Sequence, residues 1–288
     1  MDLTSIPPMV FVVSGIFTIT SINLVNRLAI NSIKTRWGVI AANYFVALIL
    51  STTMFAVNGM RPPSISTLAL GMMTGFLYIG GMYLGMATIR RRGASIAVSA
   101  SQLSVLISVG LSVVIFGESL RTNQIIGVVL AIISLPLLAA RMGSGLNGSL
   151  DKETLLLIVV QILVQGFAQF SSKVLVATGL GFERDAFFVT VFLSATLTTI
   201  PIAFIHRDMI MKKDFAYGSV VGFCNIGGNL SILLALTALP GAIVFPLVSS
   251  GGLLLVTLLT RLIFREWISR INTIGIMLTL VAVLLINL

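Results

Sequence analysis

The fold is decided by a stretch that the chain contains twice, IFGESLRTNQIIG at residues 115–127 and IFREWISRINTIG at residues 263–275. The two copies lie 148 residues apart, because their shared glutamates give 266 − 118 = 148 and their shared glycines give 275 − 127 = 148. From about residue 87 to about residue 137, roughly a dozen positions are identical at this offset without a gap. One half of the chain is therefore a copy of the other.

The composition is that of a membrane protein. Of the 288 residues, 57% are hydrophobic and 9% are charged, and the mean hydropathy is +1.09. So little polar surface cannot cover a soluble globule of this size. A helix that spans a bilayer needs about 20 mostly apolar residues, and ten such segments lie between short polar breaks. We predict helices at about residues 9–30, 37–57, 65–89, 94–117, 122–141, 154–177, 186–206, 215–238, 241–264 and 268–287.

A polar stretch divides the ten predicted helices into two sets of five. Residues 143–153 are rich in Gly, Ser and Asn and form the predicted linker, with residues 1–142 as the first five-helix repeat and residues 154–288 as the second. Because five crossings are an odd number, the second repeat must cross the membrane in the opposite sense to the first. The predicted fold is an all-α membrane protein of ten transmembrane helices, arranged as two inverted five-helix repeats.

The basic residues predict the orientation in the membrane, since Lys and Arg collect in cytoplasmic loops. Fourteen of them fall in the odd-numbered loops and the adjoining helix ends, and four fall on the other face. Both termini are therefore expected outside the cytoplasm. The run of arginines at residues 90–92 is interpreted as a topology anchor that contacts anionic lipid, with a gate for anionic substrates as the alternative. The four basic residues of the other face are Arg61, Arg121, Lys173 and Arg184.

Polar side chains near the middle of the predicted helices mark the candidate substrate site, because a polar group in the bilayer centre faces a cavity or a partner helix. Gln161, Gln165 and Gln169 are spaced i, i+4, i+8 and therefore project from one helical face, as do Asn225 and Asn229 at i, i+4. Amides donate and accept hydrogen bonds, which suits a neutral or zwitterionic ligand. Hydrogen bonding between packed helices is the alternative. The candidate substrate-binding residues are Ser21, Asn23, Tyr78, Gln102, Gln165, Gln169, Asn225, Asn229 and Ser250.

Several chemistries are not expected. No Asp or Glu falls in the middle third of a predicted helix, which argues against proton-coupled export of cationic drugs. Glu118 and Glu266 lie at helix junctions, where we expect them to complement helix N-termini and to pair with Arg121 and Arg270 respectively. One cysteine and one histidine make neither a disulfide nor a metal site, and no nucleotide-binding or hydrolase motif is present, so we expect no enzyme, cofactor or metal. The net charge of +9 is not gathered on a solvated domain, so nucleic acid is not an expected partner.

The repeated elements resemble a known family. The segments Phe-Gly-Glu at 116–118 and Phe-Arg-Glu at 264–266 each precede a helix with an early glycine, Gly127 or Gly275, and are similar to the EamA-type repeat of the drug/metabolite transporter superfamily. The resemblance covers nearly the whole chain. It implies a basket of helices around a central cavity formed chiefly by the first, third, fourth, sixth, eighth and ninth helices. Many relatives place both termini in the cytoplasm, whereas the charge pattern here predicts the reverse.

We therefore expect a secondary transporter in the inner or plasma membrane that moves a small polar organic metabolite by alternating access. The resemblance implies cargoes such as amino acids and their analogues, nucleosides, sugars, vitamins or choline. Export of an amino acid or related metabolite is the leading expectation. Uptake of a neutral nutrient such as a nucleoside, sugar or vitamin is the alternative, and a structural membrane protein without transport activity is another. The expected partners are the substrate and membrane lipids, and the oligomeric state stays open, a monomer included.

Overall fold

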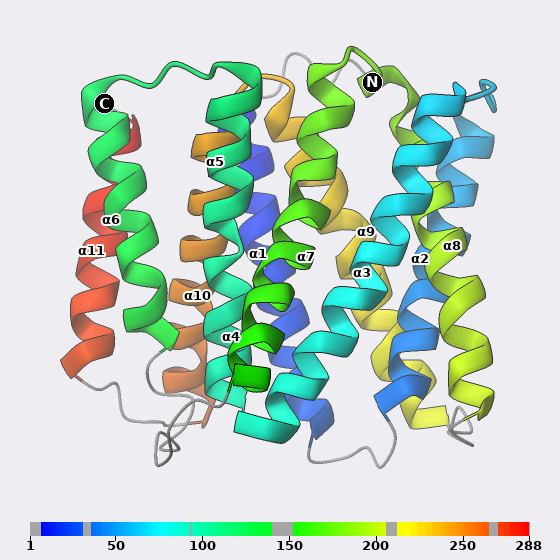
Figure 1. Cartoon of the computed structure of the whole chain (residues 1–288), viewed down its shortest axis with the longest axis horizontal. Coiled ribbons are helices and arrows are strands. Elements are labelled where there is room, and N and C mark those ends of the chain that lie inside the picture. The colour runs from blue at the N-terminus through cyan, green and yellow to red at the C-terminus, as the bar shows by residue number, and fades with distance from the viewer. Residues whose placement is uncertain are drawn as a thin grey trace.

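The computed structural model describes residues 7–30, 36–92, 94–139, 152–205, 212–264 and 270–287, and within these ranges the chain is helical, without β-strands. The helices stand side by side as one bundle (Figure 1). Their bounds are α1 Pro8–Ile30, α2 Arg36–Val57, α3 Ile65–Arg92, α4 Ala94–Leu103, α5 Val105–Phe116, α6 Thr122–Ala139, α7 Lys152–Ala177, the 3-10 helix η2 Gly181–Glu183, α8 Arg184–Ile205, α9 Lys212–Leu236, α10 Gly241–Phe264 and α11 Arg270–Asn287.

Each of the ten predicted segments is helical in the structure, and the fourth is divided in two. A turn at Ser104 separates α4 from α5, although the amide of Ser104 still donates to the carbonyl of Ala100 at 3.1 Å. Among the described residues, seven helices are long and apolar enough to cross a membrane, and three shorter apolar helices lie at Ala100–Phe116, Thr122–Leu135 and Thr273–Ile286. The predicted linker at 143–153 falls almost entirely outside the described residues, and its last two residues already belong to α7.

The outer surface of the bundle is apolar, as a lipid-facing surface must be. Large hydrophobic side chains such as Val114, Phe204 and Phe223 are 81%, 76% and 67% exposed. Soluble monomers rarely expose apolar surface of this extent. Inside the bundle, two apolar clusters fill the two ends: Phe187, Phe192 and their neighbours between α2, α3 and α8, and further residues from α1, α5, α6 and α10. The chain is therefore a multi-pass membrane protein with a packed interior.

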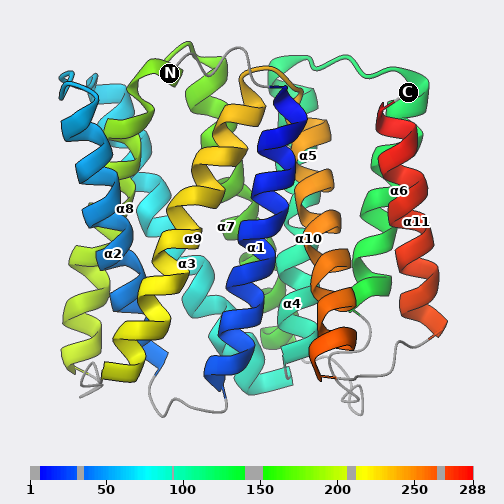
Figure 2. The same cartoon turned by 180° about the vertical axis from the view of Figure 1, so that it is seen from behind.

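The described chain begins and ends at the same face of the bundle. Figure 2 shows α1 starting at the face where α11 ends, and α7 running in the direction opposite to α1. At one end of the bundle α6 packs against α11, and at the other end α2 packs against α8 (Figure 1). The described basic residues at the start of α7 and α9 and at the end of α3 lie on the face opposite to the start of α1.

Several helix contacts occur in pairs that exchange when the two halves are exchanged. Helix α1 contacts α9 and α10, and its counterpart α7 contacts α3 and α5. Helix α2 contacts α9, and its counterpart α8 contacts α3.

The close approaches of glycine repeat in the same way. A Cβ on Gly75 of α3 would lie 2.5 Å from the carbonyl oxygen of Val191 on α8, and a Cβ on Gly222 of α9 would lie 2.5 Å from that of Asn43 on α2. The glycines differ by 222 − 75 = 147 and their partners by 191 − 43 = 148. The offset of 148 found at residues 87–137 therefore changes by one residue in α3 and α9.

Candidate functional site

A cavity of about 220 Å³ lies in the interior between helices of the two halves. Helices α1 and α3 contribute from the first half, and α7, α9 and α10 from the second. Figure 2 shows α1 placed between α9 and α10. The cavity is lined by Ile19, Ile22, Tyr78, Gln169, Ser172, Asn225, Gly228, Asn229, Ile232, Phe245, Val248 and Ser249.

The polar wall of this central cavity is a chain of hydrogen bonds across three helices. The hydroxyl of Tyr78 donates to Asn229 Oδ1 at 2.6 Å, and Asn229 Nδ2 donates to Asn225 Oδ1 at 2.7 Å. Asn225 Nδ2 in turn donates to Asn43 Oδ1 at 3.2 Å. Because each partner fixes the next, the wall is held in one arrangement before any ligand arrives, which lowers the ordering cost of binding. Each amide oxygen keeps a second lone pair for a ligand.

Gln169 brings α7 to the same cavity. Its amide nitrogen donates to Ser104 Oγ at 2.8 Å, at the turn that separates α4 from α5, and its oxygen accepts from Ser108 Oγ at 3.4 Å. Ser172 lies three residues later on the same helical face and also lines the cavity. The break in the fourth predicted helix is thus part of the structure that positions Gln169.

The other glutamines of α7 are used for packing. Gln161 is fully buried, accepts from Thr88 Oγ1 at 2.7 Å and donates to the carbonyl of Ala97 at 3.0 Å and to Ser101 Oγ at 3.1 Å. Gln165 donates to the carbonyl of Gly81 at 3.2 Å, and its oxygen is buried without a hydrogen-bond partner in the described chain. The three amides lie on one face of α7 but have different neighbours. Gln161 contacts α3 and α4, Gln165 contacts α3, and Gln169 lines the cavity.

The structure brings four of the nine predicted substrate-binding residues to the cavity, namely Tyr78, Gln169, Asn225 and Asn229. Ser21 donates to the carbonyl of Phe17, Asn23 is exposed, and the buried Ser250 donates to the carbonyl of Pro246. Gln102 and Gln165 are partly buried outside this cavity. Sequence reasoning missed Asn43, although an amide in the middle of α2 is the same signal that singled out Asn225 and Asn229.

The chemistry of the cavity is uncharged. None of the described residues that line it is Asp, Glu, Lys or Arg, and its polar groups are amides and hydroxyls between apolar walls. Such a site recognises a ligand through neutral hydrogen bonds and apolar contact. Within the described ranges, no group of three or more His, Cys, Asp or Glu is placed to hold a metal ion.

Glu118 forms an ionic cluster at the face where α1 begins. Its carboxylate accepts from the backbone amides of Gly241 and Ala242 at 2.8 and 2.9 Å, at the start of α10, and lies 2.6 Å from Lys173 Nζ on α7. The side chains of Lys173 and Glu118 are only 11% and 7% exposed, and the ammonium also lies 5.8 Å from the ring centre of Phe116. We call this group the Glu118 clasp, since it joins the end of α5 to α7 and α10.

The clasp corrects one expectation from the sequence. Glu118 does complement a helix N-terminus, but that helix is α10 and its ion-pair partner is Lys173 instead of Arg121. Arg121 is exposed, and its backbone amide donates to Gln124 Oε1 at 3.0 Å. Gly241 lies 123 residues from Glu118 along the chain and Lys173 lies 173 − 118 = 55 residues away, so neither partner is visible in local sequence. The expected pairing of Glu266 with Arg270 involves a residue, Glu266, outside the described part of the chain.

Comparisons with known proteins agree with this architecture. Residues 6–140, which lie within the first predicted repeat, match the EamA-like transporter family, whereas the resemblance was expected over nearly the whole chain. A protein of Haemophilus influenzae described as uncharacterized is 30% identical over 190 residues, which cover 64% of this chain and 63% of the relative. A solved structure described as a crystal structure of a protein shares the fold, with a TM-score of 0.75, 14% identity and coverage of 96% of this chain and 95% of that chain.

Proposed function

Residues 6–140 belong to the EamA-like transporter family of the drug/metabolite transporter superfamily, and on this premise we propose that the chain is a secondary transporter that exports an amino acid or related small metabolite by alternating access. The observation that carries the proposal is the central cavity, because a buried polar site between two bundles is where such transporters bind substrate.

The arrangement of helices supports an inverted repeat of two five-helix halves. Contacts that exchange between the halves, and helices α1 and α7 that run in opposite directions, are what a pseudo-two-fold axis in the membrane plane produces. Two states of equal architecture then arise by rocking one half against the other, with the cavity open to one face at a time.

The cavity supports a small, neutral or zwitterionic substrate. Its volume of about 220 Å³ is below the roughly 300 to 1,000 Å³ typical of drug-sized ligands. An uncharged lining cannot compensate a buried net charge, whose desolvation costs several kcal/mol. A zwitterion has no net charge and satisfies both donors and acceptors of the wall. Tyr78, Gln169, Asn225 and Asn229 are proposed to bind it directly.

The Glu118 clasp supports a closed state at the face where α1 begins. Helix α10 supplies Phe245, Val248 and Ser249 to the cavity, and the clasp holds the start of this helix against α5 and α7. Opening of the cavity toward that face requires α10 to separate from at least one of these neighbours. We place this face outside the cytoplasm, with both termini, because the described basic residues concentrate on the opposite face.

Thermal unfolding of the purified chain against a library of amino acids, nucleosides, sugars and vitamins tests the proposal. A ligand at 100 times its dissociation constant adds about 2.7 kcal/mol to stability. We expect stabilisation by at least one amino acid or close analogue, and loss of that shift in Asn229→Ala. Stabilisation by nucleosides, sugars or vitamins alone would favour nutrient uptake. No stabilisation by any compound, together with no flux in proteoliposomes, would favour a non-transporting membrane protein.

A further inference from the structure

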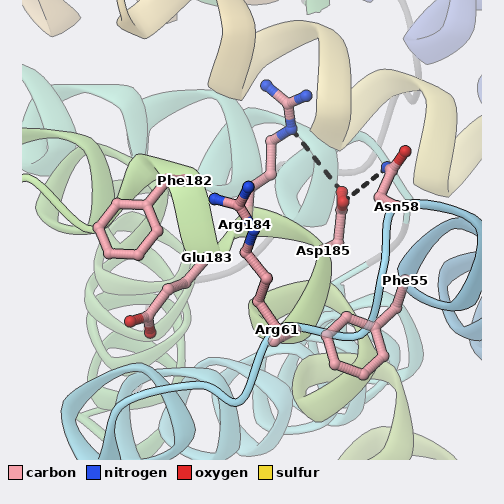
Figure 3. Close-up of a pocket in the computed structure, with 8 residues that line it drawn as sticks. Phe55, Asn58, Arg61, Phe182, Glu183, Arg184 and Asp185 are labelled. Carbon is pink, nitrogen blue, oxygen red and sulfur yellow. Dashed lines mark hydrogen bonds and ion pairs between the residues drawn. The ribbon is translucent and has the colours of Figure 1, made fainter.

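A second cavity, of about 330 Å³, lies at the face where α1 begins, where the α2–α3 connection meets η2 and the start of α8. It shares no lining residue with the central cavity. Figure 3 shows its side chains. We call this cavity the outer pocket. Its lining includes Phe55, Asn58, Arg61, Phe182, Arg184 and Asp185.

One carboxylate at this outer pocket is already committed to structure. Glu183 Oε2 accepts from the backbone amide of Ser64 at 2.9 Å and from its hydroxyl at 2.8 Å. Ser64 Oγ in turn accepts from the backbone amide of Thr67 at 3.3 Å, which caps α3. Hydrogen bonding by the side chain of Thr67, followed by that from the backbone amide of Ser64, holds the pKa of Glu183 below its usual range. Glu183 therefore anchors the start of α3 and is not available to a ligand.

The second carboxylate keeps one acceptor atom free. Asp185 Oδ2 accepts from Asn58 Nδ2 at 2.7 Å. Asp185 Oδ1 lies 3.7 Å from Arg184 Nε, which is an ion-pair distance but too long for a hydrogen bond, and it is buried without a hydrogen-bond partner in the described chain. A buried carboxylate oxygen that lacks a donor is costly, and a ligand ammonium would satisfy it.

The cationic groups of the pocket keep their donors free. Arg61 has neither an ion pair nor a hydrogen bond with any described residue, and Figure 3 shows its side chain extending between Phe182 and the start of α8. Within the described part of the chain, Arg184 is paired with Asp185 through Nε, and its two terminal nitrogens remain for a ligand. Guanidinium groups bind phosphate or carboxylate through paired hydrogen bonds. The pocket thus offers an anion site beside an ammonium site.

The surroundings place this pocket at the level of lipid headgroups. It lies at the ends of spanning helices, and the nearby apolar residues Val57, Met60 and Ile65 are 79%, 62% and 85% exposed. The rings of Phe55 and Phe182 border the polar groups. The face of a phenyl ring can contact a bound cation.

We propose that the outer pocket binds a phosphate ester that carries a primary ammonium, the headgroup chemistry of phosphatidylethanolamine. The phosphate lies on Arg61 and Arg184, and the ammonium donates to Asp185 Oδ1. The same chemistry exists in free phosphoethanolamine, which lacks the acyl chains. This site is independent of the central cavity and of the transported substrate.

Lipid retention by the purified, delipidated full chain, measured by native mass spectrometry, tests this proposal. The probes are dioleoyl lipids with ethanolamine, choline or glycerol headgroups, and free phosphoethanolamine as competitor. Choline has no N–H to donate and the glycerol headgroup has no ammonium. We expect ethanolamine lipid to bind at least ten-fold more tightly than either.

Two variants and a matched control locate the site. Arg61→Gln removes an exposed, unpaired cation, so folding should be retained, and Asp185→Asn removes the carboxylate. Arg61→Gln should weaken the retention of all three lipids, because they share the phosphate, and Asp185→Asn should abolish the preference for the ethanolamine headgroup. Arg121→Gln, an exposed cation of the same face outside the pocket, should change neither. Competition by free phosphoethanolamine equal to that by the lipid would identify the soluble source. Equal retention of all three lipids, or unchanged retention of the ethanolamine lipid in Arg61→Gln, would overturn the proposal.

Discussion

Replacement of Glu118 by glutamine tests whether the clasp is an energetic element of the fold. The carboxylate lies 2.6 Å from Lys173 Nζ, and both side chains are about nine-tenths buried. Removal of one partner of such a pair leaves a buried charge uncompensated and costs about 3 to 5 kcal/mol. Glutamine also replaces a charged acceptor for the amides of Gly241 and Ala242 by a neutral one. We expect Glu118→Gln to lose about 3 kcal/mol, a fall in Tm of roughly 6 to 12 °C.

The chain supplies its own control for this experiment. Glu153 pairs with Arg91 at 3.3 Å on the opposite face, but its side chain is 79% exposed. Exposed pairs contribute about 0 to 1 kcal/mol, so Glu153→Gln should change Tm by little. Adding Lys173→Met to Glu118→Gln removes both buried charges and should restore part of the lost stability.

Thermal unfolding in detergent can be followed with a thiol-reactive dye, because the chain has a single cysteine, Cys224, which lies within α9. The dye reacts as α9 opens. If Glu118→Gln lowers Tm no more than Glu153→Gln does, the clasp does not stabilise the bundle. If the double variant is less stable than Glu118→Gln, the loss does not come from an unpaired lysine.

Three further predictions rest on packing, on a helix cap and on the division of the α7 amides. Gly222→Ala should destabilise the chain by about 1 to 3 kcal/mol, because the added Cβ would lie 2.5 Å from the carbonyl oxygen of Asn43. The control is Gly110→Ala, whose added Cβ has no described atom within 4 Å, and it should be neutral or stabilising in the same thermal assay. Glu183→Gln should lower Tm at pH 7 and not at acidic pH. The pKa of Glu183 is lowered in the folded chain. The stabilisation by its carboxylate is therefore present above the usual pKa near 4.5 and is lost as the pH falls through the lowered pKa. A constant difference between wild type and variant across pH would contradict this. Gln161→Ala should lower Tm and leave ligand affinity unchanged. Gln169→Ala should weaken the binding of a stabilising ligand by roughly 1 to 3 kcal/mol, with a smaller change in Tm. Equal behaviour of the two variants would refute the division of roles.

The helices were predictable from sequence because their signal is local. Apolar runs of about 20 residues and short polar breaks determine where each helix begins and ends. The turn at Ser104 was not predictable, since α4 and α5 form one apolar run and the turn is held by contact with Gln169 of α7. The duplication was visible because identical residues recur at one offset. Its shift by one residue in α3 and α9 emerged only from the contacts of Gly75 and Gly222.

The candidate site was predictable in kind and only partly in detail. The spacing of Gln161, Gln165 and Gln169 correctly places them on one face, but spacing does not say which neighbour each level of that face meets. Gln169 meets the cavity, whereas Gln161 meets α3 and α4. The partner of Glu118 was missed for a similar reason, because Lys173 belongs to a helix of the other half. These contacts depend on which helices pack together in three dimensions, and the spacing of residues in a single sequence does not predict that packing.

The most direct test of the central claim is flux from proteoliposomes loaded with an equimolar mixture of the proteinogenic amino acids, with the external pool measured by mass spectrometry. We expect at least one amino acid to leave vesicles that contain the wild-type chain faster than it leaves vesicles without protein. Asn229→Ala should slow this flux at least ten-fold while Tm is retained. Ser219→Ala should leave the flux unchanged, because the partly exposed hydroxyl of Ser219 on the same helix donates to the carbonyl of Phe215. Wild-type flux that persists undiminished in a folded Asn229→Ala chain would contradict the assignment of the central cavity as the substrate site.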